Sequence, residues 1–437
     1  ALWYRDPDIA VENGGSLPLH TEWFPGWHVG VMRAGNPGGE TALYLNGYAY
    51  HGHRHQDTLG LIYHAYGQEI ASDRGYIWDD PRNAWTKSTL SHNIVTVDGQ
   101  NQASKGREAA ALELFGATPG IEVFEARADT AYEQCDRYQR TTALVILPGE
   151  QTYAVDIFRV NGGKLHQYGF QCNGNMVDLT APTPAPVDDQ IKWLSNLRAC
   201  APTEPFTATW EDDGVRTDLT VLSSIDRLLI ADAPGWRSDR GSELNAPPIQ
   251  QVFAERRAPE GAETVGSSFA AVIAPYRGTS PIISAALIEP EDGSDALAVE
   301  VQLADRTDYI ISNPDGAERQ FGPVTLAGRF GFASVAPDGT LLQGYLLDGT
   351  GLSCGGTALN IPVERFEPPV ERVEGRTYHL GRPLPTDIMP TGAYILAGDT
   401  GYEVESCTEN TITVRDYPAI ECEQLTLLNS LWFEARP

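Results

Sequence analysis

Short hydrophobic segments with alternating polar positions recur along almost the whole chain. In the first hundred residues they lie at 27–35, 40–49, 59–67, 68–76 and 92–100, and each is interrupted by Gly, Asn or Asp. Alternation with a period of two is typical of β-strands that bury one face, and the interrupting residues favour tight turns. The pattern therefore predicts antiparallel strands joined by hairpins.

The same rhythm continues beyond residue 100, with weak helical periodicity only near residues 188–199. So many strands exceed the needs of one small sandwich, and two broad packed sheets are the natural arrangement. We expect an all-β fold, with a large antiparallel β-sandwich over residues 1–290 and a smaller β domain over residues 291–437. The polar segment EPEDGSD at 289–295 places this boundary.

Composition restricts the partners of this chain. The 437 residues are 41% hydrophobic, which is ample for a buried core, and the formal net charge is −28. This acidity argues against nucleic acid as a partner. No apolar run approaches the roughly 18 residues of a membrane span, so we expect no membrane partner. Six cysteines include no CxxC pair, which disfavours a cysteine zinc site and leaves free thiols and disulfides both open.

The histidines carry the clearest chemical signal. Seven of the nine lie in the first 92 residues, and His51, His53 and His55 alternate within the segment HGHRHQD. Alternate side chains of an extended strand project from the same face, together with Asp57. Imidazoles placed in this way can reach one centre, and zinc favours three or four nitrogen and oxygen ligands.

Two further polar groups can close such a site. Asp73 ends the apolar segment EIASD, and His92 begins the strand HNIVTV. Hairpin neighbours can bring both strand ends beside His55. We therefore expect His53, His55, Asp73 and His92 to form one polar site that holds zinc, with His51 and Asp57 supporting it through hydrogen bonds.

The residues around this site resemble the heparinase II/III-like polysaccharide lyases, including alginate lyase relatives. The resemblance covers HGHRHQDTLGLIYHAYGQEIASDRGYIW at 51–78 and STLSHNIVTVDGQNQ at 88–102. The shared pattern is H-x-H-x-D, an apolar strand, a D-x-G turn, a loop with Trp or Tyr, and then H-N followed by V-x-V-D-G. Beyond Asn101 the resemblance fades. Relatives often carry another His after the Phe of DIFRVNGGKLHQYGF, where this chain has Gln171 and Cys172.

The resemblance implies a fold and an activity. Such enzymes are carbon–oxygen lyases that cleave uronic-acid polysaccharides by β-elimination, and they join an N-terminal (α/α) toroid to a β-sandwich. No toroid is expected in this chain, which opens with ALWYRDPD in the manner of a helix end running into a loop. We therefore expect it to be the C-terminal part of a longer polypeptide whose activity needs an N-terminal toroid domain or chain. The expected location is extracellular or periplasmic, because the substrate class is an acidic polysaccharide.

The resemblance also assigns roles to single residues. The structural zinc would be held by His55, Asp73 and His92, and His53 would be catalytic. Between Asp73 and His92, we expect Tyr76, Arg82, Asn83 and Trp85 to bind substrate. An arginine can pair a uronate carboxylate with two hydrogen bonds, and aromatic rings can stack on sugars.

Two other functions fit the same residues. One is a non-catalytic carbohydrate-binding or structural β protein that is stabilised by zinc. The other is a uronyl C5-epimerase, which shares the abstraction of the C5 proton but returns it without elimination. Fold analogy alone does not choose among these three functions.

Overall fold

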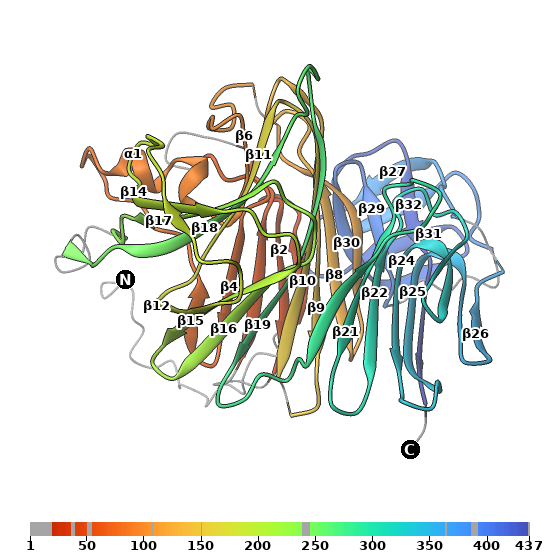
Figure 1. Ribbon diagram of the computed structural model, residues 1–437. Coiled ribbons are helices and arrows are strands. Elements are labelled where there is room, and N and C mark those ends of the chain that lie inside the picture. Colours follow the sequence, from red (N-terminus) through yellow and green to blue (C-terminus); the bar gives the residue numbers. More distant parts are fainter. Residues whose placement is uncertain are drawn as a thin grey trace, which may run out of the picture.

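The computed structural model describes residues 20–35, 40–49, 55–106, 108–149, 151–237, 245–362, 365–385 and 392–435. Nearly all regular structure in these ranges is β-strand, as Figure 1 shows, which confirms the predicted all-β class. Helix is limited there to the single turns α1 (Asn83–Thr86) and η2 (Thr89–Ser91). Neither these turns nor any other helix of the described ranges could cross a membrane.

The first sheet is an antiparallel meander in chain order. Its strands are β1 (Glu22–Phe24), β2 (Val29–Ala34), β3 (Thr41–Asn46), β4 (Leu61–Ala65) and β5 (Gln68–Ala71). Strands β2 to β5 match the sequence segments that alternate apolar and polar residues, whereas β1 lies before the first of these segments, in a stretch that the sequence did not predict as a strand.

The central sheet has eight antiparallel strands. In spatial order they are β12 (Asn175–Leu179), β15 (Phe206–Asp212), β16 (Val215–Val221), β19 (Gly266–Tyr276), β10 (Thr152–Gly162), β9 (Cys135–Ile146), β8 (Ile121–Arg127) and β7 (Ala111–Ala117). Most residues of β10 are buried on both faces. The hydroxyl of Tyr63 in the first sheet lies 3.0 Å from Thr152 Oγ1, whereas the next side chain, Tyr153, points the other way and donates to Asp308. The central sheet is therefore a middle layer.

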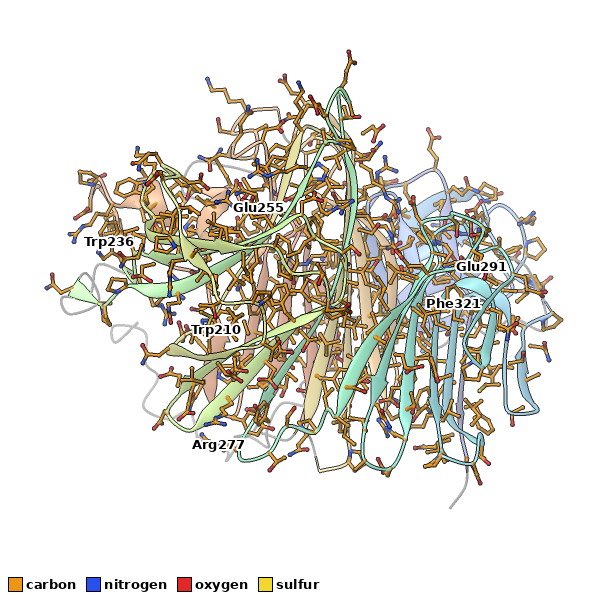
Figure 2. The ribbon with its side chains drawn as sticks, viewed as in Figure 1. Trp210, Trp236, Glu255, Arg277, Glu291 and Phe321 are labelled. Atoms are coloured by element: carbon orange, nitrogen blue, oxygen red, sulfur yellow. The ribbon has the colours of Figure 1, made fainter. Side chains whose placement is uncertain are left out.

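A third sheet shares the inner side of the central sheet with the first sheet. Its order is β13 (Ala185–Pro186), β14 (Ser195–Cys200), β17 (Arg227–Ala233), β18 (Ile249–Arg257), β11 (Leu165–Gln171) and β6 (Ile94–Val97). Phe170 of β11 packs edge-on against Trp210 of β15, with ring centroids 5.9 Å apart. Trp210 lies inside the sandwich in Figure 2. One hydrophobic core joins these three sheets, which confirms the predicted large β-sandwich.

The helical periodicity near residues 188–199 is misleading. Strand β14 and a turn in which Leu194 N donates to Ile191 O occupy this region. Ile191, Leu194 and Leu197 pack on Leu229, Ala231 and Phe253 of the third sheet. The three-residue spacing of these apolar side chains therefore comes from a turn that leads into an irregular strand, and not from a helix.

Two more sheets follow in the chain. The fourth has the order β20 (Ser284–Ile288), β21 (Leu297–Gln302), β22 (Thr307–Ser312), β24 (Val324–Val335), β25 (Leu341–Cys354) and β26 (Thr357–Asn360), with β23 (Arg319–Phe321) beside β24 and β33 (Ser430–Glu434) beside β25. The fifth has the order β27 (Val370–Glu374), β28 (Thr377–Leu380), β31 (Thr411–Val414), β30 (Thr400–Thr408), β29 (Tyr394–Ala397) and β32 (Leu425–Leu428).

These two sheets have hydrophobic cores of their own and also pack on the sandwich. Figure 1 shows the fourth sheet beside the central sheet and the fifth sheet behind it. Strand β20 pairs with β21 although it precedes residue 290. The fourth sheet therefore takes its first strand from before the predicted boundary, and the division at residue 290 stays a prediction.

Candidate metal centre

Three chain segments bring His55, Asp73 and His92 together. His55 precedes β4, Asp73 follows β5, and His92 lies between η2 and β6. His55 Nδ1 is 2.9 Å from Asp73 Oδ2 and 3.0 Å from His92 Nε2, and His92 Nε2 is 3.0 Å from Asp73 Oδ2. Both imidazoles are buried.

This triangle fits a zinc ion. Ligand atoms about 2.0–2.1 Å from zinc in a tetrahedron are separated by about 3.3 Å, close to the observed spacing. Two nitrogens and one carboxylate oxygen are a usual donor set for zinc. The sequence prediction that His55, Asp73 and His92 meet is therefore consistent with this geometry, and the identity of the ion stays a prediction.

Contacts behind the ligands prepare them for a cation. His92 Nδ1 donates to the backbone carbonyl of Ser88 at 2.7 Å, which leaves a lone pair on Nε2. Asp73 Oδ1 accepts from the backbone N–H of Gly75, so Oδ2 faces the centre. Gly75 has φ of +71°, a conformation that glycine adopts without strain. The D-x-G turn thus aims the carboxylate.

Asp57 adds negative charge beside the three ligands. Its side chain is fully buried, and its Oδ2 lies 3.9 Å from His92 Nε2. Asp57 accepts hydrogen bonds from Asn46 and Tyr48, which fits the predicted supporting role.

The carboxylates also shift the pKa values at this site. Burial lowers the pKa of His92, but Asp57 and Asp73 outweigh burial and raise it to about 9. Burial raises the pKa of Asp73, and its bonds to His55 and His92 bring it well below its usual range. The centre attracts positive charge.

A buried arginine ties two ligand segments together. Arg140 Nη1 donates to the carbonyls of Leu59 and Asn93 at 2.6 and 2.8 Å. Its other nitrogens form two bonds to Asp156, which also accepts from Tyr168. Arg140 and Asp156 are both fully buried. Because Leu59 follows His55 and Asn93 follows His92, this ion pair fixes the spacing of the two imidazoles.

Two buried glutamines hold the turn before His92. Gln171 Nε2 donates to Ser91 O at 2.6 Å, and Gln251 Nε2 donates to Leu90 O at 2.8 Å. The two residues are neighbours on β11 and β18. Gln171, which stands where relatives often carry a histidine, therefore supports the backbone of η2 in this chain.

The predicted substrate-binding residues divide into two groups. Tyr76 and Arg82 are partly exposed, and the Lys87 ammonium lies 5.3 Å from the centre of the Tyr76 ring. Arg82 forms an ion pair with Asp80, and its guanidinium lies over Trp236 at 5.5 Å. These side chains are accessible to a ligand, so their predicted role stays open. His53, the predicted catalytic residue, lies outside the described residues.

Asn83 and Trp85 have structural roles instead. Asn83 Oδ1 accepts from Ile77 N and from Thr86 Oγ1. Trp85 is fully buried, and its indole nitrogen donates to Pro234 O at 3.3 Å. The Trp85 ring therefore has no free face for a sugar, so this burial does not support the predicted stacking.

Sequence reasoning missed three accessible tryptophans around α1. Trp78 is 64% exposed and has φ of +46°, a conformation that bulky residues rarely adopt. Trp193 and Trp236 meet edge to face with centroids 5.8 Å apart, and Figure 2 labels Trp236 at the margin of the molecule. We call Tyr76, Trp78, Arg82, Lys87, Trp193 and Trp236 the aromatic ledge. Three separate loops supply it, so no single sequence motif could reveal it.

Comparison with known proteins places the candidate site in a region of recognisable sequence similarity. The sequence profile described as "Heparinase II/III-like, C-terminal" matches residues 18–224, a range that includes all three ligands. Over these residues the chain is therefore similar to the heparinase II/III-like family, as the sequence motifs indicated. An alginate lyase of Stenotrophomonas maltophilia (strain K279a) is 26% identical over 291 residues, which cover 58% of this chain and 38% of that protein.

Solved structures of heparinase II/III-like proteins share the fold. The heparan sulfate lyase HepC mutant from Pedobacter heparinus superposes with a TM-score of 0.50 at 15% identity, covering 68% of this chain and 43% of that one. The structure titled Heparinase III-BT4657 gene product gives a TM-score of 0.51 at 15% identity, with 69% and 43% covered. This chain therefore spans less than half the length of these relatives.

Proposed function

We propose that this chain is the β-sandwich part of a polysaccharide lyase that cleaves uronic-acid polymers by β-elimination. The observation that carries the proposal is the convergence of His55, Asp73 and His92. Their meeting point anchors the segment that follows His53, and the part of the aromatic ledge from Tyr76 to Lys87 lies between Asp73 and His92 in the sequence. The match of residues 18–224 to the heparinase II/III-like profile and a relative that is named an alginate lyase support the same function.

The chemistry of β-elimination sets the requirements for the site. The C5 proton next to the uronate carboxyl group must be removed, and the sugar linked through O4 must leave. This proton is weakly acidic, so hydrogen bonds or cations must neutralise the carboxylate as negative charge develops. A base and an acid within reach of C5 and O4 complete the reaction.

His53 is the proposed base, as the resemblance to the family implies. A neutral imidazole has a pKa suited to proton transfer near neutral pH. Bound zinc would supply a structural cross-link among three chain segments. His55, Asp73, His92 and the Arg140–Asp156 pair would then hold the backbone next to His53 in place, which is how a supporting shell orders a reactive group.

The aromatic ledge is the proposed substrate surface. Arg82 and Lys87 place positive charge beside aromatic rings on a protein whose net charge is −28. A uronate can meet a cation with its carboxylate and an aromatic ring with its apolar face. When the substrate binds, its carboxylate would compete with Asp80 for Arg82.

We propose that an N-terminal toroid domain or chain supplies the remaining catalytic groups. We also propose that the protein acts outside the cytoplasm, where such polymers occur.

The test is an elimination assay on the full-length protein and on this chain alone. With alginate, heparan sulfate and chondroitin sulfate as substrates, the unsaturated uronate product is followed by its ultraviolet absorbance. His53→Ala should retain the metal and lose activity by about 10²–10⁴-fold. No elimination by the full-length protein on any uronate polymer would contradict the proposal. Deuterium uptake at C5 without cleavage would instead indicate an epimerase, and binding without either reaction would indicate a non-catalytic module.

A further inference from the structure

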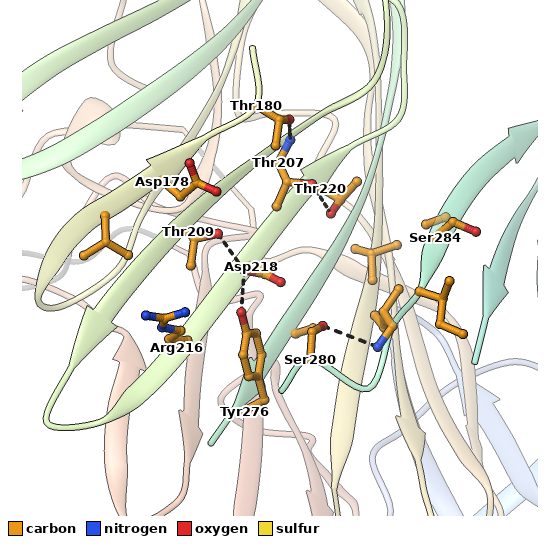
Figure 3. Close-up of a pocket in the computed structure, with 16 residues that line it drawn as sticks. Asp178, Thr180, Thr207, Thr209, Arg216, Asp218, Thr220, Tyr276, Ser280 and Ser284 are labelled. Carbon is orange, nitrogen blue, oxygen red and sulfur yellow. Dashed lines mark hydrogen bonds between the residues drawn. The ribbon is translucent and has the colours of Figure 1, made fainter. Parts of the chain in front are cut away.

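A second candidate site lies on the outer face of the central sheet. It is a groove of about 540 Å³ whose floor comes from β12, β15, β16 and β19 and whose wall comes from residues 280–285 (Figure 3). In Figure 1 these strands lie well below α1, and the groove shares no lining residue with the metal centre.

The topology explains why this face stays open. The fourth sheet covers the outer face of the central sheet near β10, where Tyr153 bonds Asp308. Its edge strand β20 stops beside the groove, so the outer faces of β16, β15 and β12 remain accessible, whereas Val272 and Ala274 of β19 are buried at the back of the groove. On the opposite, inner face, Ala208, Trp210 and Leu219 are buried in the core.

The strand register arranges polar side chains in rows across the floor. Thr209 of β15 pairs with Asp178 on one side and Asp218 on the other. Thr207 pairs with Thr220 in the next row on the same face. The hydroxyl oxygens of Thr207 and Thr220 are 2.9 Å apart. The floor thus presents a regular array of hydroxyl and carboxylate groups.

Asp218 is the centre of this array. Its Oδ1 accepts from Thr209 Oγ1 at 2.7 Å and from Tyr276 OH at 3.2 Å, bonds that Figure 3 marks. The threonine and tyrosine side chains are therefore held in fixed directions, and Ser280 of the wall is a further hydrogen-bond partner of the carboxylate. Held groups of this kind lose little entropy when a ligand binds.

The lining matches an uncharged sugar better than a uronate. Threonine hydroxyls both donate and accept, as the hydroxyls of a sugar require. Val177 and Ile283, which are 50% and 64% exposed, give the rim an apolar surface for the C–H face of a pyranose. Arg216 is the one cation among the lining residues that the structure describes, and it pairs with Glu211. Asp178 and Asp218 leave the groove negative, which opposes a polyanion.

We propose that this groove binds an uncharged oligosaccharide segment, independently of the metal centre and of the proposed lyase reaction. The groove would bind the protein to a neutral glycan, whereas the aromatic ledge would bind the acidic polysaccharide substrate. The groove is negative and the aromatic ledge carries positive side chains, so the same oligosaccharide would not bind well to both surfaces.

The test is calorimetric titration of the protein with neutral hexasaccharides, namely cellohexaose, mannohexaose, xylohexaose and maltohexaose, and with an alginate hexamer. At least one neutral probe should bind with Kd on the order of 0.1–1 mM. The double variant Thr207→Val, Thr220→Val should weaken this binding about tenfold or more, because two hydroxyls are lost. Ile283→Ser, at an exposed rim position, should also weaken it.

A matched control is available on the fifth sheet. Thr377 and Thr413 form the same kind of cross-strand pair, with hydroxyls 3.0 Å apart, and their double valine variant should bind as the unchanged protein does. The proposal is overturned if no neutral probe binds, if the groove variants bind undiminished, or if the alginate hexamer competes for the groove. Zinc content and the elimination assay should be the same in the groove variants, so the outcome does not depend on the proposed lyase function.

Discussion

His55 Nδ1 and His92 Nε2 face each other at 3.0 Å, inside a buried pocket that also contains the Asp73 carboxylate. Two ring nitrogens cannot approach in this way with lone pair against lone pair. Either a proton or a cation must lie between them. Because Ser88 O already accepts the Nδ1 proton of His92, the neutral form of this ring turns a lone pair towards the centre, as a metal ligand does.

The Arg140–Asp156 pair should be essential for the stability of the fold and for the affinity of the site for zinc. Arg140→Met leaves a buried carboxylate unpaired and removes the donor to Leu59 O and Asn93 O. We expect a loss of about 3–5 kcal/mol in the free energy of unfolding, measured by urea denaturation. Zinc affinity should fall as well, since the two ligand segments lose their link.

An exposed ion pair provides the comparison. Arg372 pairs with Glu374 on the fifth sheet and is 58% exposed, so Arg372→Met should cost about 0–1 kcal/mol. A second variant, Arg140→Met with Asp156→Leu, should recover part of the stability but not the zinc affinity, because the two carbonyls still lack their donor. Equal effects of the Arg140 and Arg372 substitutions would contradict this role.

The buried carboxyl of Glu122 should make stability depend on pH. Burial raises its pKa from 4.5 to about 8, although the backbone N–H of Arg33 and the Thr21 hydroxyl oppose the shift. The folded protein therefore holds a proton that the unfolded chain releases, and stability falls as pH rises from about 4.5 to 8. Glu122→Gln should remove this slope and be more stable than the unchanged protein at pH 8.5, by a few kcal/mol.

Thermal or urea unfolding at several pH values measures this effect. Below about pH 3.5 the two proteins should have similar stability, since the carboxyl is then protonated in both the folded and the unfolded state. The exposed Glu374, changed to Gln, should leave the pH profile as it is. A stability difference between Glu122→Gln and the unchanged protein that does not vary with pH would show that Glu122 is ionised in the fold.

Substrate affinity should depend on Trp78. Removing its exposed ring by Trp78→Ala should raise KM for the uronate polymer about 3–10-fold with little change in kcat, because stacking adds binding energy in the ground and transition states alike. Leu431 is also exposed and lies on β33 of the fourth sheet, so Leu431→Ala is the control. If both substitutions raise KM equally, the ledge is not the substrate surface.

Much of the fold was predictable because strands leave a local signal. The alternation in 27–35 and 40–49 became β2 and β3, and the D-x-G turn placed Asp73 where the sequence suggested. The order of strands in the sheets was not predictable. It depends on long-range contacts such as those of β10, which lies between β9 and β19.

The candidate site was predictable where residues form a local motif and not where three loops meet. His55, Asp73 and His92 could be named from the spacing of polar groups at strand ends and from the family resemblance. Trp85 could not be separated from Trp78 by sequence, because both lie in one polar loop, and only packing against Ala233 and Ile249 buries Trp85. Arg140 and Asp156 look like ordinary strand residues until the sheets are assembled.

The presence of the metal centre is tested by the metal content of the purified protein, measured by mass spectrometry after dialysis against trace zinc. The unchanged protein should contain about one zinc ion per chain, and chelation should lower its melting temperature. The double variant His55→Ala, Asp73→Ala should contain none, whereas His64→Ala on β4 should keep it. A protein that binds no metal, or a double variant that retains it fully, would contradict the metal centre.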